Sequence, residues 1–185
     1  MKRATYEDVL NAPENKVAEI LDGELFLSPR PGLRHARASS RLGGLLDGPF
    51  DRGKGGPGGW LLLDEPELHF GEQVVVPDLA AWRRERLPAV PDAPWLDIAP
   101  DWVCEVLSPS TARIDRGHKL RIYAEASVGH LWLLDPLEQT LEVLRLREAK
   151  WTIIAVHTGD AAVRAEPFEA NELEIRELWP DADPA

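Results

Sequence analysis

The sequence predicts a mixed α/β fold that forms one domain over residues 1–185. Residues 33–46 and 115–126 have the pattern of helices, and the second carries apolar residues at helical spacing. Short apolar runs bounded by Gly, Pro and Asp predict strands between and after these helices. No linker divides the chain, which is long enough to bury a core without disulfide bonds.

The N-terminal segment predicts a short helix followed by a hairpin. Thr5 is suited to cap a helix over residues 5–10. Residues 17–21 and 24–27 then read as two strands, because Asp22-Gly23 favours a tight hairpin turn. Glu19 lies on the first strand, where an acidic residue by itself is expected to face solvent.

Basic residues precede the helix at 33–46 and recur within it. Four arginines recur at intervals of four, three and four residues: Arg30, Arg34, Arg37 and Arg41. Such a stripe usually marks a solvated helix face, but in an acidic protein it also favours an anionic ligand. Arg34, His35 and Arg37 are therefore candidate substrate-binding residues. The glycine-rich residues 53–59 lack the phosphate-binding loop pattern and predict a flexible connection.

Two strands are expected next, at residues 60–65 and 68–82. Pro77 removes a backbone donor from the second, so we expect that strand to be bulged or unpaired beside Asp78. Residues 83–100 are rich in Pro and Arg and predict a surface excursion.

The strand at residues 102–107 contains one buried acid. Strand alternation places Glu105 between the apolar Val103 and Leu107. An unpaired carboxylate in a core costs about several kcal/mol, so Glu105 must be protonated, paired or bound to a metal ion. Lys119 follows on the next helix, where Asp115 could form with it an ordinary surface ion pair contributing about 0.2 to 0.5 kcal/mol.

The remaining chain predicts a strand at 131–135, an antiparallel pair at 141–146 and 151–156, and a last strand and short helix near 172–178.

The net charge of −11 argues against a broadly basic nucleic-acid surface, although residues 1–60 carry nine Lys and Arg against eight Asp and Glu. A single Cys excludes a Cys-based zinc site. No apolar run predicts a membrane span or a secretory signal, so we expect a cytoplasmic protein.

Asp78, Glu105 and Lys119 form the candidate constellation. Two carboxylates on adjacent strands suit a hard divalent cation such as Mg²⁺, which polarises a phosphodiester and activates water. Lys119 is suited to orient that water or to stabilise the transition state. Paired carboxylates also suit glycoside hydrolysis, but that alternative leaves Lys119 and the arginines without a role.

These residues also occur in an order that resembles a known family. The order comprises Glu19-Ile-Leu-Asp-Gly23, Ser28-Pro29, His35, Pro77-Asp78, Glu105-Val-Leu-Ser-Pro-Ser110, Asp115, Lys119, Tyr123 and Trp132. It is similar to the Uma-type endonucleases of the PD-(D/E)xK superfamily over roughly residues 5–147. The resemblance implies a restriction-endonuclease-like mixed central sheet flanked by helices, to which this chain adds an N-terminal hairpin and a C-terminal β extension.

The resemblance further implies that Asp78 and Glu105 bind Mg²⁺, for which Mn²⁺ could substitute, with Glu19 as a third acid. The superfamily's usual Lys position, two residues after the second acid, is Leu107 here, and Lys119 is the expected substitute. His130 and Leu131 also replace an acidic and a Tyr position of the family pattern.

The expected function is metal-dependent hydrolysis of phosphodiester bonds in DNA. The alternative is a catalytically silent member of the same fold that binds nucleic acid or protein. A homodimer would suit the cutting of both strands of a duplex.

Overall fold

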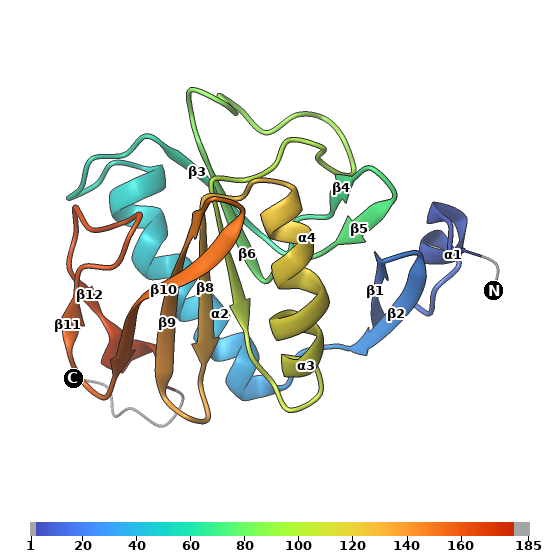
Figure 1. Ribbon diagram of the computed structural model, residues 1–185. Helices are drawn as coiled ribbons and strands as arrows, with labels where there is room; N and C mark the ends of the chain where they lie inside the picture. The colour runs from blue at the N-terminus through green and yellow to red at the C-terminus, as the bar shows by residue number, and fades with distance from the viewer. Residues whose placement is uncertain (1–2, 180–185) are drawn as a thin grey trace.

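The computed structural model describes residues 3–179, so residues 1–2 and 180–185 of the expected single unit lie outside the described part. Its centre is a six-stranded sheet in the order β10-β9-β8-β7-β6-β3 (Figure 1). The strands are β3 (Trp60–Asp64), β6 (Leu79–Arg83), β7 (Trp102–Val106), β8 (His130–Asp135), β9 (Thr140–Arg147) and β10 (Lys150–Thr158). Strands β7 and β8 pair in parallel and the other neighbours pair antiparallel, which confirms the mixed α/β class.

A second, antiparallel sheet has the order β2-β1-β5-β4. Its strands are β1 (Lys16–Leu21), β2 (Glu24–Pro29), β4 (Leu68–Phe70) and β5 (Gln73–Val75). Asp22 and Gly23 turn the β1–β2 hairpin with φ values of 58° and 82°, as their sequence predicts. A small C-terminal sheet pairs β11 (Ala162–Val163) with β12 (Leu173–Glu174).

The prediction of a single strand at residues 68–82 is wrong. The structure divides it into β4, β5 and β6, and β6 belongs to a different sheet from the other two. The break falls at Pro77, as its missing backbone donor predicts. The link from Val76 to Asp78 therefore carries the chain from one sheet to the other.

The helices are α1 (Tyr6–Leu10), α2 (Leu33–Leu46), α3 (Ala112–Ile114) and α4 (Leu120–Glu125). Helix α2 has the predicted bounds. The helix predicted at 115–126 is instead a π-helical turn, Asp115–Lys119, continued by α4, and a second π turn spans Asp47–Asp51. A 3₁₀ helix, Ile175–Leu178, follows β12. Within residues 3–179, no helix combines the length and apolarity that a membrane crossing requires.

The central sheet is covered by apolar residues on both faces. The residues of β7 alternate between the two apolar clusters that cover these faces. Trp102, Cys104 and Val106 join the cluster that includes residues of α2. Val103 and Leu107 join the cluster that includes residues of α4. Glu105 shares the second face and is only 2% exposed, so the predicted position of this acid in the core is confirmed.

The glycine-rich residues 53–59 are held in place, contrary to the predicted flexible connection. The amide of Gly58 donates to the carbonyl of Pro49 at 2.9 Å, and the side-chain amide of Asn171 donates to the carbonyl of Gly55 at 2.9 Å. A Cβ added to Gly56 would stand 2.4 Å from the Pro49 side chain. Glycine is therefore used here for close packing as well as for turning.

Candidate active site

The buried ammonium of Lys119 is the centre of the site. Its Nζ lies 3.1 Å from Glu105 Oε2, 3.1 Å from Glu19 Oε1 and 3.7 Å from Asp115 Oδ1. It also donates to the carbonyl of Val76 at 3.1 Å. A buried ammonium needs such acceptors, because losing water is costly for a charged group.

Glu19 enters the site from the hairpin sheet. Its side chain is 4% exposed, so the interpretation of Glu19 as a solvent-facing strand residue is wrong. Its Oε1 accepts the amide hydrogen of Val76 at 2.8 Å. The peptide groups of Val76 therefore serve both partners of the ion pair: the amide binds Glu19, and the carbonyl binds Lys119. This is possible because β5 ends at Val75 and leaves the peptide groups of Val76 outside the β-ladder.

The π turn presents the remaining charged residues. Asp115, Lys119 and Tyr123 follow one another at intervals of four residues and are all buried. The interpretation of Asp115 and Lys119 as a surface ion pair is wrong for that reason. π turns are rare and often occur at functional sites, where the wider turn reorients side chains.

Both carboxylate oxygens of Glu105 have partners. Its Oε1 accepts a hydrogen bond from the Tyr123 hydroxyl at 2.5 Å, while its Oε2 faces Lys119. Burial raises the pKa of Glu105 well above its ordinary value of 4.5, and nearby acids add to this effect while Lys119 opposes it.

Burial and the neighbouring charges also shift the pKa values of Asp115 and Lys119. Burial, with lesser effects from Asp78 and Glu19, raises the pKa of Asp115 from 3.8 to about 6 although Lys119 opposes the rise. Burial by itself would lower the pKa of Lys119, but the negative charges of Glu105, Glu19 and Asp115 outweigh burial and raise this pKa well above 10.5. Lys119 is therefore a lasting cation, and one cation does not neutralise the acids around it.

Asp78 follows the break at Pro77 and is oriented from both sides. Its Oδ2 accepts the amide hydrogen of Val106 at 2.7 Å, which ties it to the end of β7. Its Oδ1 lies 3.1 Å from His35 Nε2 on α2. Burial disfavours the imidazolium, but the hydrogen bond to Asp78 and the charges of nearby carboxylates together outweigh this effect and raise the pKa of His35 above 6.5.

These groups line a cavity of about 330 Å³. Its charged and imidazole side chains are those of Glu19, Arg30, His35, Glu65, Asp78, Glu105, Asp115 and Lys119. Ser108, Ser110 and Thr111 contribute hydroxyl groups at another wall. Five carboxylates against one Lys and one Arg make the cavity anionic at neutral pH.

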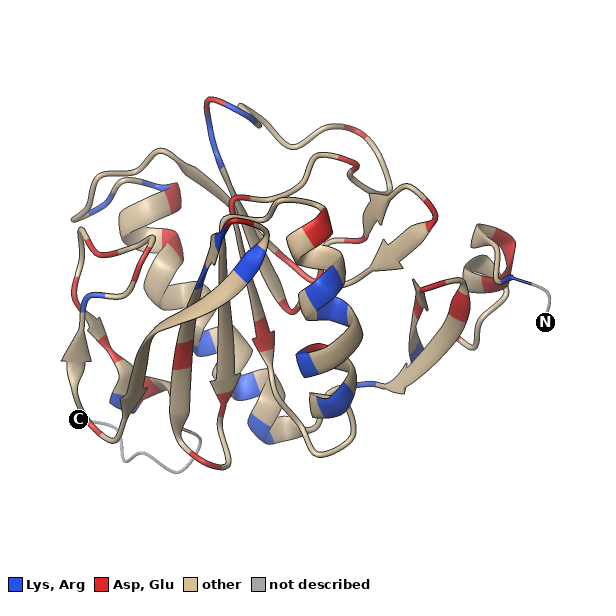
Figure 2. Cartoon of the chain, in the orientation of Figure 1, with Lys and Arg blue, Asp and Glu red and all other residues tan. Residues whose placement is uncertain are grey.

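The structure brings most of the sequence-derived candidates to this cavity. Five of them line it: Glu19, His35, Asp78, Glu105 and Lys119. Arg34 and Arg37 are exposed on α2 and do not line it, whereas Arg30, just before the helix, does. Figure 2 shows that basic residues occur on the N-terminal part of α2 and along the α3–α4 segment.

Asp115, Tyr123 and the backbone of Val76 contribute to the site, although the sequence prediction assigned none of them a role in it. The four-residue spacing from Asp115 to Lys119 and from Lys119 to Tyr123 indicates that these side chains share one helix face with Lys119. The role of Val76 had no signal in its side chain. His130, one of the departures from the family pattern, instead lies 3.2 Å from Glu166, which does not line the cavity.

The donor chemistry of the cavity fits a hard divalent cation. Asp78 and Glu105 offer carboxylate oxygens, the ligands that such a cation prefers. Burial is the main cause of the raised pKa values of Glu105 and Asp115, and the neighbouring acids add to it. Among residues 3–179, no group of three or more His, Cys, Asp or Glu is already arranged to hold a metal ion.

Comparisons with known proteins match the fold and the sequence of this chain. A crystal structure of "a putative nuclease belonging to DUF820" from Anabaena variabilis superimposes with a TM-score of 0.76 at 25% identity, covering 95% of this chain and 97% of the other. No curated protein sequence matches. The profile of the Uma2 family, described as "Putative restriction endonuclease", matches residues 3–176. The chain, with its nuclease-like fold and acidic cavity, therefore belongs to the Uma2 family.

Proposed function

We propose that the protein is an endonuclease that uses Mg²⁺, or Mn²⁺ in its place, to hydrolyse phosphodiester bonds in DNA. One observation carries the proposal: buried acids from both sheets surround Lys119 in a cavity whose negative charge exceeds its positive charge. The family and the structural relative support nuclease chemistry at this cavity. An anionic cavity repels a phosphodiester unless a cation is added, which is why the proposal includes a metal.

Asp78 and Glu105 would hold the cation. When bound, it would supply polarisation of the phosphodiester and a lower pKa for the attacking water. Hydrolysis forms a bond from water oxygen to phosphorus and breaks the bond from phosphorus to a sugar oxygen, which leaves with a proton.

Lys119 would act at the attacked phosphate. Its pKa, which is raised well above 10.5, keeps Nζ protonated at neutral pH. A fixed ammonium can donate a hydrogen bond to the attacking water or to a phosphate oxygen on which negative charge develops. Glu19 and the carbonyl of Val76 orient this ammonium, so Glu19 serves as a positioning residue. His35 orients Asp78 in the same way.

The test is DNA cleavage by the wild type and by Asp78→Asn, Glu105→Gln and Lys119→Met in Mg²⁺, in Mn²⁺ and in EDTA. Removing one preorganised electrostatic group typically lowers the rate by about 100-fold or more. Asp92→Asn, at an exposed residue of the surface excursion, is the matched control and should cut as the wild type does. Equal cleavage by all variants would show that the activity comes from a contaminant.

The alternative is a binding protein that has kept the fold without cleavage. It is favoured by the fact that Lys119 and Tyr123 already engage both oxygens of Glu105. Titration calorimetry separates the two functions. Binding of Mg²⁺ that Glu105→Gln abolishes supports the nuclease. Absence of both metal binding and cleavage supports the alternative.

A further inference from the structure

A second cavity adjoins the candidate active site on the side of the hairpin. Its volume is about 730 Å³, and it lies between the β1–β2 hairpin and the α3–α4 segment. Ser110 and Ile114 line both cavities, so the two share a wall. Nothing in the proposed chemistry uses the second cavity.

The second cavity has the opposite charge from the first. Its charged lining consists of Arg113, Arg121 and Asp22, and His118 is also present. The lining of two Arg and one Asp has a local excess of positive charge in a chain with a net charge of −11. Arg121 is paired with Asp22 and with Glu125, so the positive charge offered to a ligand is mainly that of Arg113. A phosphate would be repelled by the acids of the first cavity and attracted to the second.

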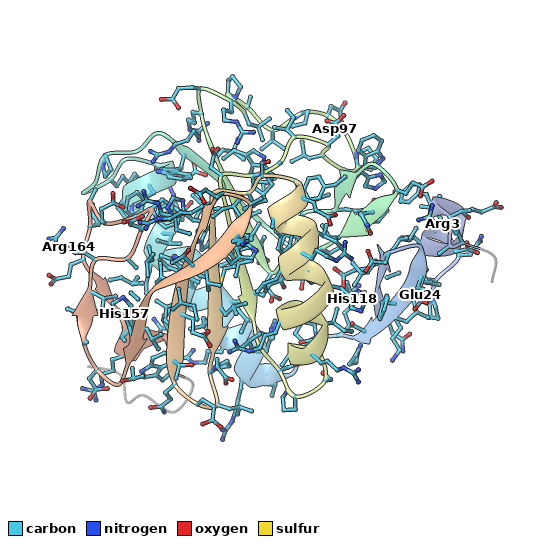
Figure 3. The ribbon with its side chains drawn as sticks, in the orientation of Figure 1. Arg3, Glu24, Asp97, His118, His157 and Arg164 are labelled. Carbon is cyan, nitrogen blue, oxygen red and sulfur yellow. The ribbon has the colours of Figure 1, made fainter. Side chains whose placement is uncertain are left out.

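Two of the basic groups, Arg121 and His118, are held in place before any ligand binds. Asp22 forms ion pairs with Arg121 and, at 2.6 Å, with His118 Nδ1. The hydrogen bonds from Arg121 and His118 lower the pKa of Asp22 to about 2, so it is ionised at neutral pH. In Figure 3, His118 lies on the side of the helical segment that faces the hairpin. Ordering these side chains in advance reduces the entropy lost on binding.

An aromatic surface lies beside the basic groups. The rings of Phe26 and His118 have their centroids 5.4 Å apart at an interplanar angle of 50°. Both side chains are half-buried, so each ring keeps part of its surface open to the cavity. A positive groove with aromatic rings is the arrangement that binds single strands, through phosphate contacts and base stacking.

We propose that the second cavity binds an unpaired nucleotide of the DNA strand that enters the candidate active site. Its phosphate would contact Arg113, and its base would stack on Phe26 and His118. The nucleotide must be unpaired, because a base inside a duplex is stacked on its neighbours and cannot offer its face to a protein ring. This inference rests on the proposed function for the identity of the ligand.

The test measures the affinity for a fluorescent oligothymidylate in EDTA, where the proposed cleavage does not occur. Phe26→Leu, which keeps an apolar side chain in the hairpin, should weaken binding by about tenfold through lost stacking. Arg113→Ala should reduce the slope of log affinity against log salt by about 0.7, the effect of one lost phosphate contact on a single strand. Arg147→Ala is the control, because Arg147 is exposed and lines neither cavity.

Wild-type affinity in both Phe26→Leu and Arg113→Ala would overturn the inference, even if the wild type cuts DNA in Mg²⁺. If the two variants lose as much affinity for a duplex of the same length as for the single strand, the requirement for an unpaired base is overturned. Conversely, weaker single-strand binding by both variants supports the second cavity even if no cleavage is found. The failure of this inference is thus distinguishable from the failure of the proposed function.

Discussion

Replacing Lys119 with Met should destabilise the protein severely, because it removes the cation and keeps the acids. Met preserves an unbranched side chain of similar length, so packing changes little. Glu19 and Glu105, each 3.1 Å from Nζ and nearly fully buried, lose their common partner. Breaking a buried ion pair from one side costs about 3 to 5 kcal/mol. For a chain of this size, that corresponds to a fall in Tm of about 6 to 20 °C.

Urea unfolding followed by Trp fluorescence, in EDTA at neutral pH, measures this loss. Lys54→Met is the matched control, because Lys54 is exposed in the glycine-rich loop. Mg²⁺ should restore more stability to Lys119→Met than to the wild type. A ligand at about 100 times its Kd adds about 2.7 kcal/mol. If Lys119→Met unfolds at the same urea concentration as Lys54→Met, the ammonium does not neutralise the buried acids, and the account of the site fails.

Three further predictions concern pH, a hydrogen bond and packing. Folding raises the pKa of Asp115 from 3.8 to about 6, so the free energy of unfolding of the wild type should fall by about 3 kcal/mol as the pH rises from 3.8 to about 6. Unfolding curves of Asp115→Asn should lack this fall. A pH profile of Asp115→Asn identical to that of the wild type would contradict the prediction. Tyr123→Phe removes the donor to Glu105 Oε1 and should cost about 1 to 3 kcal/mol in the free energy of unfolding, whereas no loss would show that the bond contributes nothing. Gly56→Ala should lower the free energy of unfolding by about 1 to 3 kcal/mol, because the added Cβ would clash with the side chain and carbonyl of Pro49. Gly44→Ala, where the Cβ meets open space on α2, should raise it by about 0.5 to 1 kcal/mol. Thermal melts that rank the two variants the other way would refute the packing argument.

The sequence predicted the parts of the fold that depend on local patterns. Helix α2 and the Asp22-Gly23 hairpin follow from helical spacing and turn chemistry, and both lie where they were expected. Strand alternation also correctly placed Glu105 on the same buried face as Val103. The strand predicted at 68–82 failed because apolar content does not reveal which sheet a strand joins. Pro77 marked the break but not the change of sheet.

The site shows the same division. Asp78, Glu105 and Lys119 were suggested by the sequence because each has an unusual local setting: a Pro-Asp break, an acid in an apolar strand and a basic residue beside a packing face. Glu19 has the pattern of an exposed strand residue, and its burial depends on the second sheet covering it. The π turn at Asp115–Lys119 likewise has no signal in apolar spacing, because a helix that widens by one residue keeps nearly the same pattern.

The double role of the Val76 backbone bears on the order in which the protein folds. Its amide meets Glu19 from 57 residues away, and its carbonyl meets Lys119 from 43 residues away. Each contact closes a long loop, and the entropy of closure is lost before the contact contributes. The hairpin and α2 can form from near neighbours, whereas the charged cluster needs both sheets joined. We therefore expect the cluster to assemble in the last stage of folding, from Asp115 and Lys119 that until then remain hydrated.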